Sequence, residues 1–348
     1  MNEISEFCHD LKAQMKPKKG RLDRPVAFWS EPDRYQDEII DAFVIILKTK
    51  GCSWAQESGC TMCGYFNDSA LTNISDDDLL TQFHIAMEKY NNEPVVKIFT
   101  SGSFFDKDEI TEIIQEKILQ KLSKTTKKIA VESRPEYITN KDLERCDTNL
   151  SESSLEVGVG LESAHDDIRN FNVNKGFNFQ DYQTAAHILH DHHHLLKTYV
   201  LVKPPFLSEK QAIHDAIETI RATADITDTI SLNPTNVQKG TLVEYLWKRH
   251  YYRPPWLWSI IEILKKGSKK TKKRIQCDVV GGGSRRGPHN CRKCDKPILK
   301  NIRNFSLTQD LSYLSFSECE CKQQWHDQLN LEPLSFGSFI DIQRGLIA

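Results

Sequence analysis

Apolar and polar positions follow one another in a regular order along residues 42 to 233. Six short apolar runs, rich in β-branched residues and bounded by turn residues, are separated by longer segments with the apolar spacing of amphipathic helices. Such runs predict buried strands, and the segments between them predict helices. The predicted strands are 42–47, 95–99, 128–133, 154–161, 195–202 and 229–233, and the predicted helices are 76–90, 108–122, 139–146, 181–194 and 208–222.

Strands that alternate with helices pair in parallel through right-handed crossovers, so this order predicts an α/β fold. In such folds the loops that follow the strands carry function. Five successive strand ends hold polar or flexible residues. Each alone would satisfy an ordinary turn, but five at one face favour a ligand pocket. These ends are 100–103, 132–135, 160–163, 203–205 and 233–235.

The alternation stops near residue 241. Residues 242–252 and 256–266 predict two further helices, after which come a basic segment and a Gly-rich region with cysteines. We therefore expect an N-terminal extension (1–40), a core α/β domain (41–240) and a small C-terminal α+β extension (241–348).

The composition, 39% hydrophobic and 27% charged, is that of an ordinary globular protein. The first residues lack the basic and apolar regions of a signal peptide, and no apolar stretch reaches membrane length, so we expect a cytoplasmic protein without membrane contact. The net charge of −2 conceals bunched basic residues at 12–24 and 265–274, and more lie at 285–293. Such clusters are either solvated surface or contacts to a phosphate backbone.

Ten cysteines in a reducing compartment are more typical of metal sites than of disulfides. Cys52, Cys60 and Cys63 share one loop after the first predicted strand. An iron–sulfur cube needs four ligands, so three cysteines would leave one iron open to a small molecule. The alternatives are a structural zinc site, which needs a fourth fixed ligand, and three unlinked thiols.

A second group contains Cys277, Cys291 and Cys294, with Cys319 and Cys321 as candidates for a fourth position. Four thiolates can close a tetrahedral zinc site and so stabilise the small C-terminal extension. A second iron–sulfur cluster remains an alternative, as does replacement of one cysteine by His289.

The order of these features resembles the radical S-adenosylmethionine enzymes: a cysteine triplet after strand one, Ser-Gly after strand two and Glu-x-Arg after strand three. The resemblance covers roughly residues 40 to 240 and implies a partial parallel (β/α)6 barrel. Residues 132–137 (ESRPEY), 159–163 (VGLES) and 174–176 (NKG) are similar to the branch that contains the Elongator catalytic subunit. That subunit's acetyltransferase domain has no counterpart here.

Three further motifs are similar to the archaeal radical enzymes for archaeosine formation, which implies an archaeal source. They are 51–54 (GCSW), 59–65 (GCTMCGY) and 287–295 (GPHNCRKCD). Two positions depart from the superfamily pattern. Seven residues separate the first two cysteines where three are usual, and Met62 stands where an aromatic residue is common.

The resemblance implies that Cys52, Cys60 and Cys63 hold a [4Fe–4S] cluster whose fourth iron binds S-adenosylmethionine. The implied contacts to that cofactor come from the strand-end loops. They involve Ser101, Gly102 and Ser103 at the methionine end, Glu132 at the ribose, Arg134 at a carboxylate, and Glu162 and Tyr65. Glu132 and Arg134 could instead form a structural ion pair.

The implied substrate is tRNA that carries a lysine adduct of 7-cyano-7-deazaguanine at position 15. A radical would break the carbon–nitrogen bond of the lysine and leave the amidine of archaeosine. The resemblance also implies an archaeosine synthase partner protein that attaches the lysine, and an electron donor. The alternatives are another radical reaction on RNA, such as methylthiolation, and a zinc-stabilised nucleic-acid-binding protein without catalysis.

Overall fold

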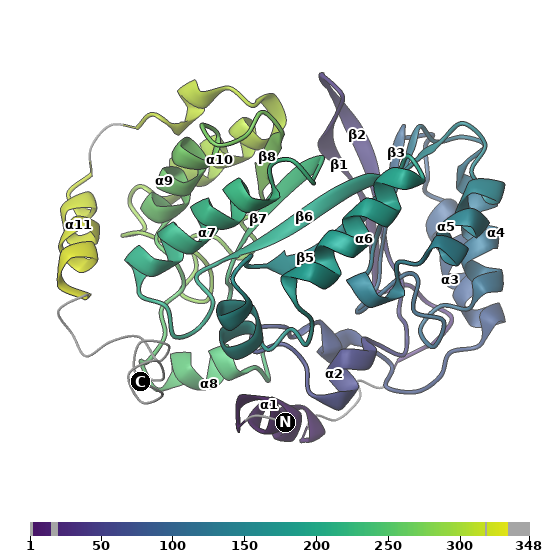
Figure 1. Ribbon diagram of the computed structural model, residues 1–348, viewed down its shortest axis with the longest axis horizontal. Coiled ribbons are helices and arrows are strands. Elements are labelled where there is room, and N and C mark those ends of the chain that lie inside the picture. The colour runs from purple at the N-terminus through teal and green to yellow at the C-terminus, as the bar shows by residue number, and fades with distance from the viewer. Residues whose placement is uncertain (1–2, 15–19, 317–318, 333–348) are drawn as a thin grey trace.

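A computed structural model describes residues 3–14, 20–316 and 319–332. Its centre is an eight-stranded sheet in the order β1 to β8 (Figure 1). Strands β2 to β8 pair in parallel, and β1 pairs with β2 in antiparallel fashion. The strands are β1 (Ala27–Tyr35), β2 (Glu38–Ile46), β3 (Val95–Phe99), β4 (Lys128–Glu132), β5 (Ser154–Glu162), β6 (Leu195–Val202), β7 (Thr229–Pro234) and β8 (Arg274–Cys277).

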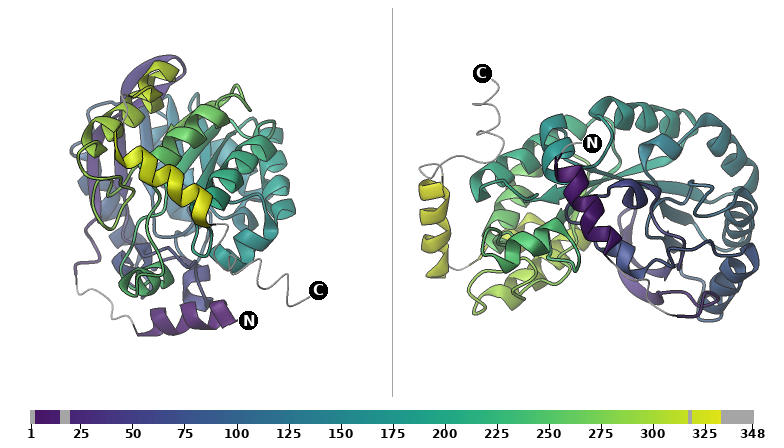
Figure 2. Two further views of the ribbon diagram at one scale, coloured as in Figure 1. Left: turned by 90° about the vertical axis from the view of Figure 1, so that its left-hand side faces the viewer. Right: turned by 90° about the horizontal axis from the view of Figure 1, so that it is seen from below.

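The six predicted strands correspond to β2 through β7, so the predicted parallel α/β half-barrel is confirmed. Strands β1 and β8 extend it at both edges. Seen from below in Figure 2, the strands curve around an axis and helices lie outside them. The helices that follow the strands include α3 (Asp76–Met87), α4 (Glu112–Leu122), α5 (Asn140–Asn149), α6 (Phe179–Asp191), α7 (Glu209–Thr223), α9 (Leu257–Gly267) and α10 (Asp295–Thr308).

Alternate residues of each strand face the helices and form the hydrophobic core. Val96 and Ile98 of β3 and Val131 of β4 are almost fully buried there. The side-chain period of two turns the residues between them toward the concave face. The outer apolar layer therefore fixes which side chains line the inside of the barrel.

Toward the amino-terminal ends of the strands, the concave face of the sheet carries charged side chains. Lys128 and Lys197 lie 3.0 and 3.5 Å from the Glu156 carboxylate. Lys97 lies 2.8 Å from Asp33 of β1. Burial opposes ionisation of Glu156, but the two lysines outweigh it and hold its pKa at about 2. These buried side chains thus fill this layer of the barrel with paired charges rather than apolar groups.

The segment after residue 240 adds β8 to the same sheet. The predicted helix 242–252 ends earlier, as α8 (Leu242–Lys248), because His250 takes a left-handed backbone conformation (φ +61°). Helices α1 (Glu3–Ala13) and α2 (Ser53–Glu57) lie along the lower edge of Figure 1 with α8, and α11 (Cys321–Leu331) lies at its left. No helix in the described ranges is both long and apolar enough to cross a bilayer.

Candidate functional site

The first cysteine loop begins where β2 ends. Gly51 turns the chain with φ +102°, and a Cβ there would lie 2.5 Å from the Ser69 hydroxyl, so only glycine fits. Cys52 occupies the N-cap position of α2, and Cys60 and Cys63 follow in the next turns. All three thiols are half-buried and free. The loop therefore presents three sulfurs at the carboxyl end of the sheet.

The connection from β5 to α6 holds this loop in place. The Thr61 N–H donates to the Val173 carbonyl at 2.9 Å. The Asn174 amide donates to the Gly59 carbonyl at 2.8 Å, and the Trp54 indole donates to the Asn174 carbonyl at 2.8 Å. Asn174 reaches these partners from a left-handed backbone conformation (φ +58°). The Asn-Lys-Gly motif thus supports the cysteine loop from the neighbouring strand end.

The loop after β3 packs directly against the first cysteine. A Cβ on Gly102 would lie 2.6 Å from the Cys52 Cα, so the two backbones touch where a side chain has no room. The Ser101 hydroxyl donates to the Tyr65 carbonyl at 3.4 Å. The structure therefore brings Ser101, Gly102 and Tyr65 beside the cysteine loop.

The Ser103 side chain points into the protein interior and not toward the cysteine loop. It is 1% exposed, and its hydroxyl accepts the Arg134 N–H at 3.0 Å. Its own N–H donates to the Glu109 carboxylate at 2.6 Å, and the Thr49 hydroxyl donates to the same carboxylate. Ser103 and Glu109 thus join the ends of β2, β3 and β4. The sequence contains no signal that singles out Glu109.

Arg134 is buried between two aromatic rings, those of Trp54 and Phe177, with its guanidinium 5.4 Å from each centroid. Arg134 forms an ion pair with Glu136. The alternative of a structural ion pair between Arg134 and Glu132 is therefore not what the structure shows. Arg134 also donates to the Lys175 carbonyl at 2.9 Å. Arg134 therefore fastens the strand-end loops together.

Glu132 and Glu162 lie at neighbouring strand ends with different partners. Burial raises the pKa of Glu132, and a hydrogen bond from Tyr199 partly opposes this. Glu162 pairs with Lys175 at 2.8 Å from a left-handed backbone conformation (φ +68°). Such strain persists only where surrounding contacts fix it, and it marks the β5 end as a specialised position.

The charges around the thiols fit a thiolate-bound cluster. Burial raises the pKa of Cys52 to about 12, and the Arg134 guanidinium opposes this shift. Burial also raises the pKa of Cys63, against the charge of Lys175. In the described part of the chain the three sulfurs do not all lie within 4.8 Å of one another. Metal binding deprotonates thiols, and these cations would compensate the resulting charge.

The second cysteine group is compact. The sulfurs of Cys291, Cys294, Cys319 and Cys321 all lie within 4.8 Å of one another, and four of their separations are 3.5 to 3.7 Å. Tetrahedral zinc with bonds of about 2.3 Å places its sulfurs roughly 3.8 Å apart. The spacing therefore suits one ion held by all four.

Cys277 and His289 are not members of this group. Cys277 ends β8, is 5% exposed in the core, and donates its N–H to the Ser306 hydroxyl at 2.9 Å. Of the five candidate cysteines, four lie together, and Cys277 is the one left out, because the strand turns its side chain into the core. His289 faces the Gly287 carbonyl at 2.7 Å.

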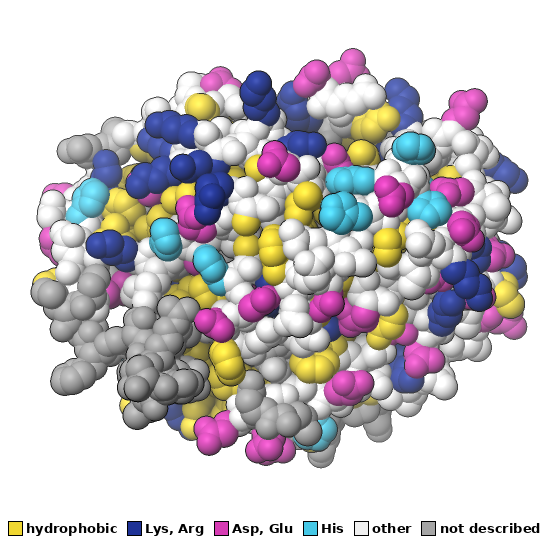
Figure 3. Space-filling view, in the orientation of Figure 1, with side chains coloured by type: hydrophobic (Ala, Val, Ile, Leu, Met, Phe, Trp, Pro, Cys, Tyr) yellow, Lys and Arg dark blue, Asp and Glu magenta, His cyan; other side chains and the backbone are white. Residues whose placement is uncertain are grey.

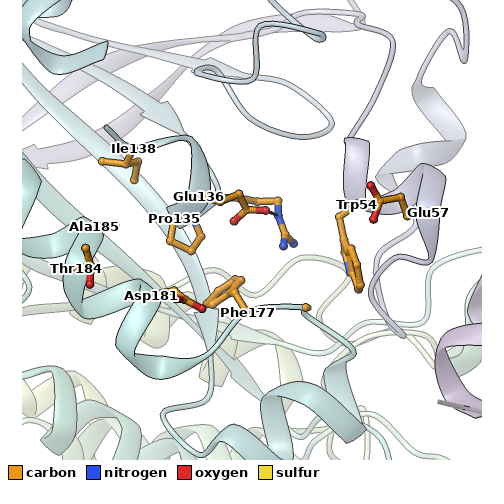
Figure 4. A pocket seen from close by; sticks show the side chains of 11 residues that line it. Trp54, Glu57, Pro135, Glu136, Ile138, Phe177, Asp181, Thr184 and Ala185 are labelled. Atoms are coloured by element: carbon orange, nitrogen blue, oxygen red, sulfur yellow. Dashed lines mark hydrogen bonds and ion pairs between the residues drawn. The ribbon is translucent and has the colours of Figure 1, made fainter. Parts of the chain in front are cut away.

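A pocket of about 550 Å³ lies on the outer flank of the site, between α2 and α6 (Figure 4). Trp54, Arg134 and Phe177 form its inner wall, and Asp181 and Thr184 of α6 face them. No cysteine lines it. The three thiols of the first cysteine loop therefore do not line this pocket.

Comparison with known proteins gives close relatives. No protein-family model matches the chain. It is 41% identical over 340 residues to archaeosine synthase subunit beta of Methanosarcina acetivorans, which covers 96% of this chain and 98% of that protein. It is 38% identical over 308 residues to archaeosine synthase subunit beta of Thermococcus kodakarensis, covering 86% and 95%. Among solved structures, Methanocaldococcus infernus Elp3 with an N-terminal deletion aligns at 14% identity over 66% of this chain and 58% of that chain, with a TM-score of 0.48.

Proposed function

The chain belongs to the family of archaeosine synthase beta subunits, and from this we propose that it is a radical S-adenosylmethionine enzyme that acts on tRNA. One observation carries the proposal: a loop with three free thiols and the polar ends of the neighbouring strands meet at one end of the barrel. We assign the reaction as cleavage of the carbon–nitrogen bond of the lysine adduct on 7-deazaguanine at tRNA position 15, which leaves the archaeosine amidine.

In this proposal Cys52, Cys60 and Cys63 hold a [4Fe–4S] cluster with one open iron. When bound and reduced, the cluster with S-adenosylmethionine supplies a 5′-deoxyadenosyl radical. Ser101 and the Gly102 backbone provide polar contacts for the methionine end. Ser103, Arg134 and Glu162 are already engaged within the protein, so their role is to position the loops.

Glu132 lies at the end of β4 and accepts hydrogen bonds from the ribose hydroxyls. Its half-buried carboxylate also has a hydrogen bond from Tyr199. Tyr65, which is 56% exposed beside the cysteine loop, contacts the nucleoside. The paired charges toward the amino-terminal ends of the strands fill the barrel there, so water and substrate enter at the cysteine end.

We assign zinc to the four-cysteine group, because the sulfur separations match one tetrahedral ion. The designation of the relatives as a beta subunit supports a partner subunit for this chain. That partner would supply the lysine-modified tRNA, and a separate protein would donate the electron.

Anaerobic reconstitution tests the proposal. We expect about four irons beyond the zinc, and 5′-deoxyadenosine production with S-adenosylmethionine and reductant. Cys60→Ala should lose both, whereas Cys146→Ala, at a buried thiol outside both groups, should keep both. Lysine-adduct tRNA should yield archaeosine only with the wild type and the control.

Two results would contradict the assignment. A wild type that holds zinc alone and cleaves no S-adenosylmethionine would indicate a zinc-stabilised nucleic-acid-binding protein. Production of 5′-deoxyadenosine with a methylthio group added to RNA, and no cleavage of the adduct, would indicate a different radical reaction.

A further inference from the structure

Helix α1 crosses the cysteine loop, although its sequence carries no motif. In Figures 1 and 2 it lies beside α2 at the end of the barrel where the first cysteine loop emerges. The hydroxyls of Ser5 and Ser58 lie 2.6 Å apart, and the His9 ring nitrogen lies 2.9 Å from the Glu57 carbonyl. On its other side Phe7 meets the Tyr245 ring of α8 edge-on. The helix is thus fixed on the backbone that leads to Cys60.

The last turn of α1 inserts a lysine into this loop. Lys12 is 7% exposed, and its ammonium donates to the Ser58 carbonyl at 3.2 Å. A Cβ on Gly59 would collide with that ammonium, so the charge occupies the space beside the residue that precedes Cys60. Among the residues with described positions, no carboxylate pairs with Lys12.

A buried ammonium without a counter-ion is costly, because one carbonyl replaces only part of its hydration. Other buried lysines of this chain follow the rule: Lys97, Lys175 and Lys203 each pair with a carboxylate at 2.7 to 2.8 Å. Burial raises the pKa of the Cys63 and Cys8 thiols, and the charge of Lys12 opposes both shifts. The negative charge of thiolates that bind a metal cluster would give Lys12 the counter-ion that the other buried lysines have.

We propose that Lys12 is a positioning residue for the iron–sulfur cluster, with its ammonium as the counter-ion of the cluster-bound thiolates and α1 as the strap that carries it. This rests on the proposed function. A cation beside the cluster stabilises its more negative, reduced state, so Lys12 raises the reduction potential. It also ties the folding of α1 to the presence of the cluster.

The test uses the full chain with Lys12→Met, which keeps the length of the side chain without the charge, and Lys12→Arg, which keeps the charge. Lys117→Met, on the exposed face of α4, is the matched control. Potentiometric titration without S-adenosylmethionine should give a more negative midpoint for Lys12→Met alone. Without metal, Lys12→Met should melt at or above the wild-type temperature; with the cluster it should melt below it.

An unchanged midpoint in iron-loaded Lys12→Met would overturn the inference and leave the proposed function intact. So would an equal loss of stability with and without the cluster, because that pattern describes ordinary packing. A wild type that takes up no iron at the first loop would remove the proposed function, and the inference with it.

Discussion

At the scale of single residues, the buried carboxylate of Glu109 is the centre of the strand-end loops. It accepts hydrogen bonds from the Thr49 hydroxyl, three residues before Cys52, and from the Ser103 N–H in the loop after β3. Burial raises the pKa of Glu109 to about 7, although these hydrogen bonds oppose the shift. The side chain therefore changes charge near neutral pH, directly beneath the candidate cluster loop.

This pKa makes stability depend on pH. The folded value of about 7 lies above the unfolded value of 4.5, so the folded state binds the proton more tightly. The resulting stabilisation is complete below the unfolded pKa and is lost as pH rises through 7, by up to about 3 kcal/mol. We expect Glu109→Gln to reduce this decline, as measured by urea unfolding between about pH 5 and pH 8.

A second carboxyl sets how much of the decline remains. Burial also raises the pKa of Asp215 to about 7, although the Ser163 hydroxyl donates to it. The Glu109→Gln protein should therefore keep part of the slope, and the double variant with Asp215→Asn should have a smaller slope still. An unchanged slope in the double variant would contradict these assignments.

At the scale of elements, the sequence predicted strands β2 to β7 because each is an apolar run between turn residues. Strand β1 escaped prediction because it contains Pro32 and the acidic residues Glu31 and Asp33. Those carboxylates pair with Lys97, which lies more than sixty positions away. The residues that argue against a buried strand are thus satisfied by partners that no local pattern reveals.

The candidate site also has a part that the sequence predicts and a part that it does not. The meeting of the strand ends followed from parallel topology, so the cysteine loop and residues 100–103 could be placed together in advance. The supports at Glu109, Lys12 and Asn174 could not, because they are side-chain contacts between distant loops. Such contacts leave no periodic signal in the sequence.

The four-cysteine element connects α10 with the start of α11, and its metal should be necessary for its stability. The Trp258 indole donates to the Cys321 sulfur at 3.3 Å, which joins the group to α9. We expect Cys319→Ser to lose one zinc by metal analysis and about 4 kcal/mol or more of unfolding free energy. Cys277→Ala should retain zinc; loss of zinc in this control would return Cys277 to the ligand set.

Exposed basic side chains lie at opposite ends of the barrel, in residues 265–274 and at the end of α8. Residues 265–274 precede β8, and Figure 3 shows lysine and arginine side chains gathered near α7 and α9. Helix α8 follows β7 at the cysteine end, where the Asn67 amide donates to the Lys239 carbonyl at 2.8 Å. Beyond α8, Tyr251 is 79% exposed next to exposed Lys248 and Arg249. Exposed aromatic and basic groups suit nucleotide stacking and phosphate contact.

If tRNA enters at the cysteine end, the α8 side chains should contribute to binding and the remote lysines should not. We expect the triple variant Lys248→Gln, Arg249→Gln, Tyr251→Ala to bind tRNA roughly 10 to 100 times more weakly, with a shallower salt dependence in anisotropy titrations. Lys269→Gln with Lys270→Gln is the matched control. The reverse result would place the tRNA on the far end.

At the scale of the whole molecule, ion pairs join the two edges of the sheet. Arg274 of β8 donates to Asp33 of β1 at 2.8 Å and to the Arg34 carbonyl at 2.7 Å. Arg34 in turn donates to the Leu307 carbonyl at the end of α10 at 3.0 Å. The first and last strands are thereby held together across the opening of the half-barrel.

Removal of the shared carboxylate should weaken the whole fold. Asp33→Asn leaves Lys97 and Arg274 without their common partner, so we expect a loss of about 3 to 5 kcal/mol in urea unfolding. Asp37→Asn, at the exposed tip of the same hairpin, should change stability by less than about 1 kcal/mol. Equal effects of the two substitutions would show that the edge pairing contributes little.

The same arrangement bears on how a partner protein could bind the chain. An unprotected edge strand offers main-chain groups to any extended segment and is a common route to both assembly and aggregation. Here the Arg34 carbonyl, at the outer edge of β1, already accepts a hydrogen bond from Arg274. Association by β-augmentation is therefore blocked at this position, and a partner would have to recognise this edge through its side chains.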